Sequence, residues 1–285
     1  MAHLAANFLL RVLKVVIDAL FPLKCLVCGG FFHLLDGPKR QTSSFKVQNE
    51  FLFHDHGDKT TDLLFGSYLC SVCTADFVPI QSPICLSCGI MFRSKEGSNR
   101  ICGDCITLPK RFRIARAPLA YDQALMNLIH CYKYSGKIQL AKPLGGLLLV
   151  TFHRYWDADN IDLLIPVPLY TGRFKQRGFN QAYLLIYNWE KIAKELNLIV
   201  PGIPIETHAL LRNRSTAAQT GLGRKERMLN IKNAFGVRQP EKIKGKRILL
   251  VDDVYTTGAT VDECSRVLLE NGAKYVDVLT VARAM

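Results

Sequence analysis

The chain has 285 residues, of which 49% are apolar, so it can bury a substantial core and form one large and one small domain. No apolar stretch reaches the length of a membrane-spanning helix, so we expect no integral span. The net charge of +13 is uneven, since residues 106–285 carry 27 Lys and Arg against 15 Asp and Glu, whereas residues 1–105 carry 10 against 9. We therefore expect any polyanionic partner to bind the second part of the chain.

An apolar stretch with interspersed charges opens the chain. Residues 8–21 include Arg11, Lys14 and Asp18, which a signal peptide or a spanning helix would not normally carry. We interpret residues 1–24 as an amphipathic helix packed on the protein, and a helix that lies on a membrane surface or binds a partner is the alternative. Nothing marks the chain as secreted, so we expect a cytoplasmic protein, with the inner face of the membrane as an alternative location.

Eight of the ten cysteines form four CxxC pairs within the first 105 residues. A two-residue gap lets both thiolates of a pair bind one tetrahedral Zn²⁺, and two pairs complete a closed site without a vacant position. Pairing in chain order predicts two structural zinc ions in a double zinc-ribbon domain over residues 25–110, with residues 29–69 as an insertion. The predicted ligands are Cys25, Cys28, Cys70, Cys73, Cys85, Cys88, Cys102 and Cys105.

The other candidate metal ligands are left unassigned. His33, His54 and His56 lie in the insertion and are substitute ligands, although isolated loop histidines are more often solvated. Cys131 and Cys264 stand alone on helical patterns, and we expect both to be buried small apolar residues.

From about residue 111 the apolar pattern alternates between helices and short buried strands. This alternation predicts an α/β domain over residues 111–285, with a parallel sheet and helices on both faces. Helices are expected over residues 121–134, 141–155, 181–196 and 259–270, and extended segments over residues 163–167, 209–211, 248–251 and 276–281.

The segment 248–260, ILLVDDVYTTGAT, places two carboxylates between an apolar strand and a Thr- and Gly-rich turn. Ligands of open α/β sheets bind at the carboxyl ends of such strands. Gly258 lets the backbone approach an anion and the next helix points its positive end inward, so residues 256–260 suit a 5′-phosphate. Asp252 and Asp253 suit the vicinal diol of a ribose, each charged hydrogen bond contributing roughly 1.5–3 kcal/mol.

This segment resembles the phosphoribosyl-pyrophosphate (PRPP) signature of type I phosphoribosyltransferases. In that family the acidic pair holds the ribose 2′- and 3′-hydroxyls and the TTGxT turn holds the 5′-phosphate. The resemblance implies the type I phosphoribosyltransferase fold and a site for PRPP with Mg²⁺. It assigns these roles to Asp252, Asp253, Val254, Thr256, Thr257, Gly258, Ala259 and Thr260.

Residues 165–182, IPVPLYTGRFKQRGFNQA, leave a second strand through a Tyr-Thr-Gly turn and then supply three cations that suit a pyrophosphate. In the resembled enzymes the loop after this strand binds pyrophosphate and often contains a non-proline cis peptide, which would fall within residues 169–172. The residues assigned to PRPP here are Tyr170, Thr171, Arg173 and Arg177.

Residues 212–235 mix cations with Gln and Gly and are too polar for a core, so we interpret them as a mobile lid that ends in a helix. Similar enzymes close such a lid over PRPP and add positive charge as pyrophosphate leaves. For any single arginine a solvated helix face is the alternative. The candidates are Arg212, Arg214, Arg224 and Arg227.

The four CxxC pairs together with residues 165–182, 219–235 and 251–260 resemble the ComF family of bacterial competence proteins over about residues 20–285. The long insertion departs from the family pattern. Membership implies a zinc-ribbon domain joined to a phosphoribosyltransferase domain, a link to uptake or processing of single-stranded DNA, and a helicase-like partner. The alternative is a metabolic phosphoribosyltransferase that transfers ribose 5-phosphate from PRPP to an unidentified nitrogen acceptor.

The basic segments also suit single-stranded DNA. Residues 171–227 hold ten Lys and Arg against four Asp and Glu, interleaved with Phe174, Phe179 and Tyr183, which can stack on bases. A basic rim that serves only PRPP is the alternative. The residues expected on the DNA-binding face are Arg173, Lys175, Arg177, Arg224, Lys225 and Arg227.

Overall fold

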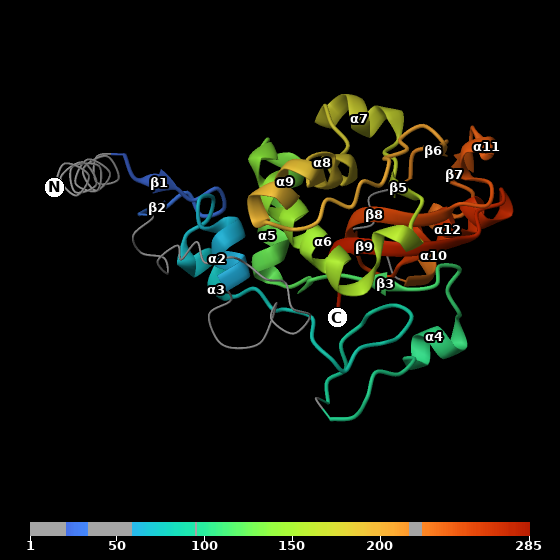
Figure 1. The fold of residues 1–285 in the computed structure, drawn as a ribbon, viewed down its shortest axis with the longest axis horizontal. Helices are drawn as coiled ribbons and strands as arrows, with labels where there is room; N and C mark the ends of the chain where they lie inside the picture. The colour runs from blue at the N-terminus through green and yellow to red at the C-terminus, as the bar shows by residue number, and fades with distance from the viewer. Residues whose placement is uncertain (1–20, 34–58, 95, 217–223) are drawn as a thin grey trace. The chain divides into compact units, whose positions relative to one another are not determined.

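The computed structural model describes residues 21–33, 59–94, 96–216 and 224–285, and Figure 1 draws their fold. The chain divides into two compact units, residues 1–77 and residues 78–285. The second group of four cysteines therefore belongs to the larger unit, and the boundary after residue 110 stays a prediction. Residues 1–20 of the expected amphipathic helix and most of the insertion lie outside the described residues. No described helix is long and apolar enough to cross a membrane.

The smaller unit contains a short hairpin and two short helices. Strand β1 (Leu23–Lys24) pairs antiparallel with β2 (Phe31–Phe32), and α2 (Lys59–Phe65) precedes α3 (Ser71–Ala75). Leu64, Phe65 and Leu69 are buried, and Phe65 packs edge-on against Phe77 with ring centroids 5.6 Å apart. Among the described residues of this unit few apolar side chains are buried, which is typical of small domains that depend on a bound metal.

The larger unit is built on a parallel sheet, as the alternating pattern predicts. The strand order is β5 (Leu163–Pro166), β8 (Arg247–Tyr255), β9 (Tyr275–Arg283) and β3 (Ala115–Arg116), and β4 (Leu119–Ala120) also pairs with β9. Beside it, β6 (Leu210–Arg212) pairs antiparallel with β7 (Phe235–Val237).

Helices cover both faces of this sheet, with α12 (Ala259–Glu270) on one face and α6 (Ala141–Tyr155) and α8 (Gln181–Tyr187) on the other. The unit also contains α4 (Gly103–Thr107), α5 (Gln123–Tyr134), α7 (Thr171–Arg177), α9 (Trp189–Leu196), α10 (Arg224–Ile231) and α11 (Pro240–Ile243). Ile248 and Leu250 of β8 share a buried cluster with Cys264 and Leu268 of α12. Because successive strand residues point to opposite faces, α6 and α8 contact β9 and β8 from the other side (Figure 1).

Several local expectations differ from the structure. The helix expected over residues 181–196 is two helices that meet at Asn188, and residues 171–177 form α7, which Gly178 ends with φ of 83°. Asn180 caps α8, its side chain accepting the N–H groups of Ala182 and Tyr183. Residues 169–172, where some of the resembled enzymes have a cis peptide, are trans here, and the one cis peptide among the described residues is Ser82–Pro83.

Candidate functional site

The acidic pair lies where the sheet opens at its carboxyl edge. Strand β5 ends at Pro166, which is opposite Val251, whereas β8 continues to Tyr255 alongside β9. The Val167 N–H still donates to the Val251 carbonyl at 2.8 Å, and the chain then turns away into α7. Among the described residues, β8 is therefore flanked by β9 alone from Asp252 onward. The carboxyl edge of the sheet is where α/β proteins bind ligands.

Asp252 and Asp253 are both buried but have different surroundings. Because they are neighbours in a strand, their side chains point to opposite faces of the sheet. The Asp253 Oδ2 atom lies 2.8 Å from the Lys133 Nζ atom of α5. Asp252 accepts the Asp253 N–H at 2.9 Å and feels the charge of Arg212. Lys133 therefore forms an ion pair with Asp253, whereas Asp252 feels Lys133 and Arg212 only as nearby charges.

This environment raises the pKa values of Asp252 and Lys133. Burial and then the neighbouring Asp253 raise the pKa of Asp252 to about 7, although Lys133 and Arg212 act in the opposite direction. Burial of Lys133 acts to lower its pKa, but Asp253 and Asp252 outweigh burial and raise it. Lys133 therefore stays charged at neutral pH, whereas Asp252 titrates there. A carboxylate pair of this kind can bind a hydroxyl pair or a divalent cation.

Residues 256–260, the TTGAT turn, connect β8 to α12. Gly258 has φ of 79°, and a Cβ atom there would lie 2.2 Å from the Tyr255 hydroxyl oxygen, so only glycine fits. Helix α12 begins at Ala259, directly after this glycine. Thr256, Thr257 and Thr260 are half-buried. The N–H groups of the first turn of α12 and its positive end suit an anion.

Two of the predicted arginines meet beside the acidic pair. Arg212 of β6 donates to the Thr216 hydroxyl, and Arg173 of α7 donates to the Thr216 carbonyl at 3.2 Å. Burial lowers the pKa of Arg212, and the nearby charges of Arg173 and Arg214 lower it further. Because Arg173 and Arg212 share Thr216 as a hydrogen-bond partner, they lie close enough together to bind a single polyanion.

The other predicted site residues that the structure describes have partners outside the acidic pair. Arg214 donates to the carbonyls of Asn230 and Lys232 at 2.9 and 2.7 Å, at the carboxyl end of α10. Arg177 donates to the Gln181 side chain and lies over the Tyr134 ring, 5.0 Å from its centroid. Tyr170 caps α7, and Thr171 is its first residue and is exposed.

The lid prediction is not tested by this structure. Residues 217–223 lie outside the described residues, and of α10 the structure gives the backbone but not the side chains of Arg224, Lys225 and Arg227.

Each of the two predicted groups of cysteines comes together, and His33 is part of neither. The first tetrad is Cys25, Cys28, Cys70 and Cys73, the second is Cys85, Cys88, Cys102 and Cys105, and the four sulfurs of each lie within 4.8 Å of one another. The Cys28 and Cys70 sulfurs are 3.8 Å apart, and those of Cys88 and Cys102 are 3.7 Å apart. Four thiolates about 2.3 Å from one tetrahedral ion would be about 3.8 Å apart. Both tetrads can therefore hold a metal ion.

Hydrogen bonds favour the thiolate form of Cys85 in the second tetrad. The Cys88 and Cys102 N–H groups donate to the Cys85 sulfur at 3.4 and 3.3 Å. Burial acts to raise the pKa of Cys85, but these N–H groups outweigh it and lower the pKa to about 7. A thiolate is the form that binds a metal.

The lone cysteines differ from each other. Cys264 is buried in α12, as expected, whereas Cys131 is only half-buried on α5, so that part of the expectation is wrong.

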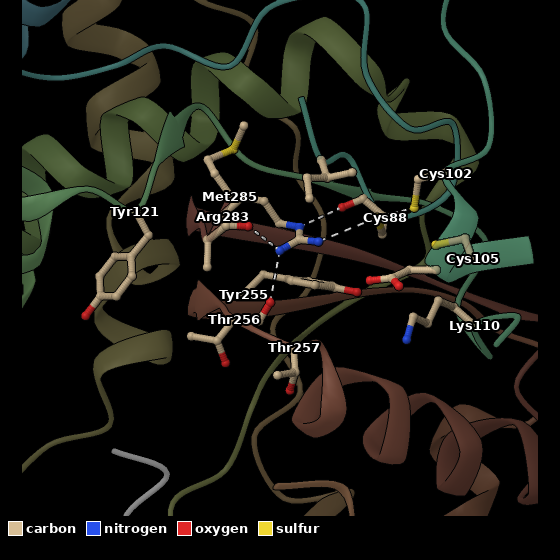
Figure 2. Close-up of a pocket in the computed structure, with 13 residues that line it drawn as sticks. Cys88, Cys102, Cys105, Lys110, Tyr121, Tyr255, Thr256, Thr257, Arg283 and Met285 are labelled. Carbon is tan, nitrogen blue, oxygen red and sulfur yellow. Dashed lines mark hydrogen bonds between the residues drawn. The ribbon is translucent and has the colours of Figure 1, made fainter. Parts of the chain in front are cut away.

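The second tetrad is part of the core of the larger unit. Cys85, Cys88 and Cys105 belong to the buried cluster that also contains Tyr255 and Ala259. A pocket of about 440 Å³ lies between the tetrad and the TTGAT turn, and Figure 2 shows its lining residues. The predicted metal site and the predicted phosphate site are therefore neighbours in space.

Sequence reasoning missed two residues of this site. Lys133 is a cation in the last turn of an otherwise largely apolar helix, and Arg283 is the last residue of β9. The sequence showed each of them only as a charged residue at the end of an otherwise apolar helix or strand. Nothing in the local pattern shows which residue such a charge contacts.

Known proteins resemble this chain over most of its length. A family model of the phosphoribosyl transferase domain matches residues 190–285. The chain is 33% identical over 220 residues to the DNA utilization protein YhgH of Shigella flexneri, covering 76% of this chain and 91% of the relative. It is 30% identical over 222 residues to Competence protein F of Haemophilus influenzae, covering 76% and 90%, and 29% identical over 219 residues to Competence protein ComFC of Streptococcus pneumoniae, covering 76% and 88%.

The chain belongs to the ComF family. Its phosphoribosyltransferase fold and family, both predicted from the motifs, are confirmed. The part of this ComF-family chain that matches the transferase model contains the acidic pair, the TTGAT turn and Arg212. The geometric site and the family match therefore coincide in the larger unit.

Proposed function

We propose that this ComF-family protein binds PRPP with Mg²⁺ and acts on single-stranded DNA in competence or DNA utilization. The observation that carries the PRPP assignment is the buried Asp252–Asp253 pair, which faces one lysine and is followed by a glycine-dependent turn at the start of α12. In this proposal the ribose diol binds the carboxylates and the 5′-phosphate binds the TTGAT turn. The acidic pair would also help to hold Mg²⁺, which would offset the charge of the pyrophosphate. Arg173 and Arg212 bind the pyrophosphate oxygens.

Calorimetric titration tests the ribose assignment. We expect the double variant D252N/D253N to bind Mg²⁺-PRPP about 2 to 3 kcal/mol more weakly than the parent, because two charge-assisted acceptors become neutral ones. The variant E270Q, which removes a carboxylate at the far end of α12, serves as the control and should bind like the parent. Equal affinities of the parent and the double variant would refute the assignment.

We also propose that each cysteine tetrad holds a structural zinc ion. The support is the tetrahedral spacing of the sulfurs and the closed set of four thiolates, which leaves no position for substrate. Metal analysis of the purified protein should give two zinc ions per chain. One ion or none in a reduced preparation would contradict the proposal.

Two observations support DNA binding: the cations of α7 in the larger unit, and relatives named DNA utilization protein and Competence protein F. On α7, Phe174 is 47% exposed and lies between Arg173 and Lys175, so a base can stack on its ring while phosphates meet the cations. A helicase-like competence partner, which the family resemblance implies, belongs to the same proposal.

A salt titration with a single-stranded oligonucleotide tests DNA binding. With about four to six phosphate contacts, the slope of log affinity against log salt should be near −3 to −4. The triple variant R173A/K175A/R177A should lose most of the affinity. The charge-matched control is K242A/K244A/K246A, which removes three cations before the start of β8 and should bind like the parent. A flat salt response, or equal binding by both triple variants, would favour the alternative.

That alternative is a metabolic phosphoribosyltransferase with a nitrogen acceptor. The pairing of Arg173 and Arg212 on Thr216 favours it, because a departing pyrophosphate needs cations held in place. Release of pyrophosphate from PRPP in the presence of a candidate amine or base, lost in R212A, would establish this function.

A further inference from the structure

One buried side chain joins the second cysteine tetrad to the TTGAT turn. Arg283, 8% exposed, donates from Nε to the Cys88 carbonyl at 3.1 Å and from Nη1 to the Thr256 carbonyl at 2.9 Å. Its Nη2 atom lies 3.6 Å from the Cys88 sulfur, and its guanidinium covers the Tyr255 ring at 4.1 Å from the centroid. Figure 2 shows these contacts between the tetrad and the turn. A guanidinium can serve several acceptors in one plane, which an ammonium cannot.

Tyr255, whose ring Arg283 covers, also restricts the conformation of the TTGAT turn. The Tyr255 hydroxyl lies so close to Gly258 that a Cβ atom there would be 2.2 Å away, so the ring position sets the path of the turn. Phe112, which follows the tetrad in the chain, packs edge-on against the same ring at 6.0 Å. The Arg111 N–H donates to Asp262 in the first turn of α12 at 2.7 Å. The second tetrad therefore reaches Thr256 through Arg283. The residues that follow the tetrad contact the Tyr255 ring and the first turn of α12.

The other end of this connection packs against β3. The Ser87 carbonyl accepts the Ala115 N–H at 2.7 Å, which ties the first pair of the tetrad to β3. Gly89 packs so closely that a Cβ atom there would lie 2.5 Å from the Ala115 carbonyl oxygen. A metal ion on the four sulfurs would fix the remaining freedom of Cys88, and with it both Arg283 contacts at that residue.

We propose that Arg283 is a positioning residue that holds the TTGAT turn against the second cysteine tetrad, so that the metal-loaded tetrad sets the affinity of the turn for a phosphate ester. This inference rests on the proposed binding of a 5′-phosphoribosyl ligand. The tetrad then does more than stabilise the fold, because its geometry is transmitted to a ligand-binding loop by a single side chain.

The variant R283K tests this role with ribose 5-phosphate as the probe. Lysine keeps the charge but loses the planar fork, so we expect about tenfold weaker binding, within the usual range for energetic coupling between sites. Amide exchange without ligand should become faster in residues 255–260 and stay unchanged in residues 247–251. The metal content should remain that of the parent. The control is R266K in α12, the helix that follows the turn. The hydrogen bonds of Arg266 go to Glu263, Glu270 and Asn233, so the affinity and the amide exchange of R266K should match those of the parent.

Two results would overturn the inference. Unchanged exchange in the turn with unchanged affinity would show that Arg283 does not position it, and faster exchange throughout β8 and β9 with loss of metal would show a purely structural role. If neither protein binds ribose 5-phosphate, the proposed function fails, whereas the exchange measurement still decides the role of Arg283.

A measurement on the parent protein alone covers the case in which R283K does not fold. Coupling is reciprocal, so ribose 5-phosphate should slow the transfer of metal from the second tetrad to a chromogenic chelator. The first tetrad, which lies in the smaller unit, provides the internal reference and should release metal at the same rate with and without ligand. Equal slowing at both tetrads, or none at either, would contradict the inference.

Discussion

Asp252 and Asp253 are neighbours in the chain, yet one is paired and the other is not. Lys133 neutralises Asp253 at 2.8 Å, whereas burial and Asp253 raise the pKa of Asp252 to about 7. The pair therefore carries between one and two negative charges at neutral pH. A ligand that donates hydroxyl hydrogen bonds or carries a cation stabilises the fully ionised pair. A diol bound together with a metal ion provides both.

The raised pKa of Asp252 predicts how stability depends on pH. Ionising this buried group costs folding free energy, and the cost is absent below the ordinary pKa of 3.8, grows as pH rises and is complete above about pH 7. We expect the parent to lose stability relative to D252N between about pH 4 and pH 7, measured by urea unfolding. Parallel stability profiles for the two proteins would show that Asp252 is not held in this environment.

Replacing Lys133 should leave a buried carboxylate without its cation. We expect K133M to destabilise the larger unit by about 3 kcal/mol, the usual cost of removing one partner of a buried ion pair. The double variant K133M/D253N should recover part of that loss, because it also removes the buried charge. Chemical unfolding of the three proteins measures both effects, and a K133M protein as stable as the parent would contradict the ion pair.

The two glycines at either end of β8 allow a matched test of the turn. Gly258 and Gly245 have φ of 79° and 71°, but only at Gly258 would a Cβ atom collide with a neighbour. Both G258A and G245A should lose about 1–2 kcal/mol from the left-handed conformation. Only G258A should also lose binding of ribose 5-phosphate, measured by calorimetry. Equal binding by the two variants would mean that the turn tolerates displacement.

At the scale of elements, the sequence predicts best where the apolar pattern and its punctuation agree. Helix α12 begins and ends at the predicted residues, because Gly258 precedes it and Asn271 follows. Strand β8 extends four residues past the predicted Val251, because pairing with β9 outweighs the low strand propensity of two aspartates. The break at Asn188 was not visible, since the apolar residues on its two sides continue one helical pattern.

The site divides in the same way. The acidic pair, the turn and both tetrads could be predicted because each is a local motif whose chemistry follows from spacing. Lys133 and Arg283 could not be, since they reach the site from elements that only the fold brings together. Arg212 and Arg173 were predicted as cations, but their meeting at Thr216 depends on the pairing of β6 with β7.

The two tetrads should differ in what depends on them. The second contributes to the core of the larger unit, whereas the first lies in the smaller unit. We therefore expect C88S to lower the unfolding temperature of the larger unit and C28S to leave it unchanged, measured by scanning calorimetry. Equal shifts in both variants would show that the second tetrad is not integrated with the sheet.

For the whole molecule, charge is consistent with the proposed division of labour. The cations are concentrated in residues 106–285, which also contain the acidic pair and the turn. The acidic pair is buried, so its carboxylates are not exposed to a polyanion that binds the basic surface. PRPP and a DNA strand can then bind the same unit, one in the crevice and the other on the surface.

A crystal structure of the metal-loaded protein with Mg²⁺-PRPP is the most direct test of the proposed site. We predict the 5′-phosphate on the backbone N–H groups of residues 257–260, the ribose hydroxyls on Asp252 and Asp253, and the pyrophosphate facing Arg173 and Arg212. Density for PRPP elsewhere, or crystals grown at saturating PRPP with water alone on the acidic pair and the turn, would contradict the assignment of this crevice.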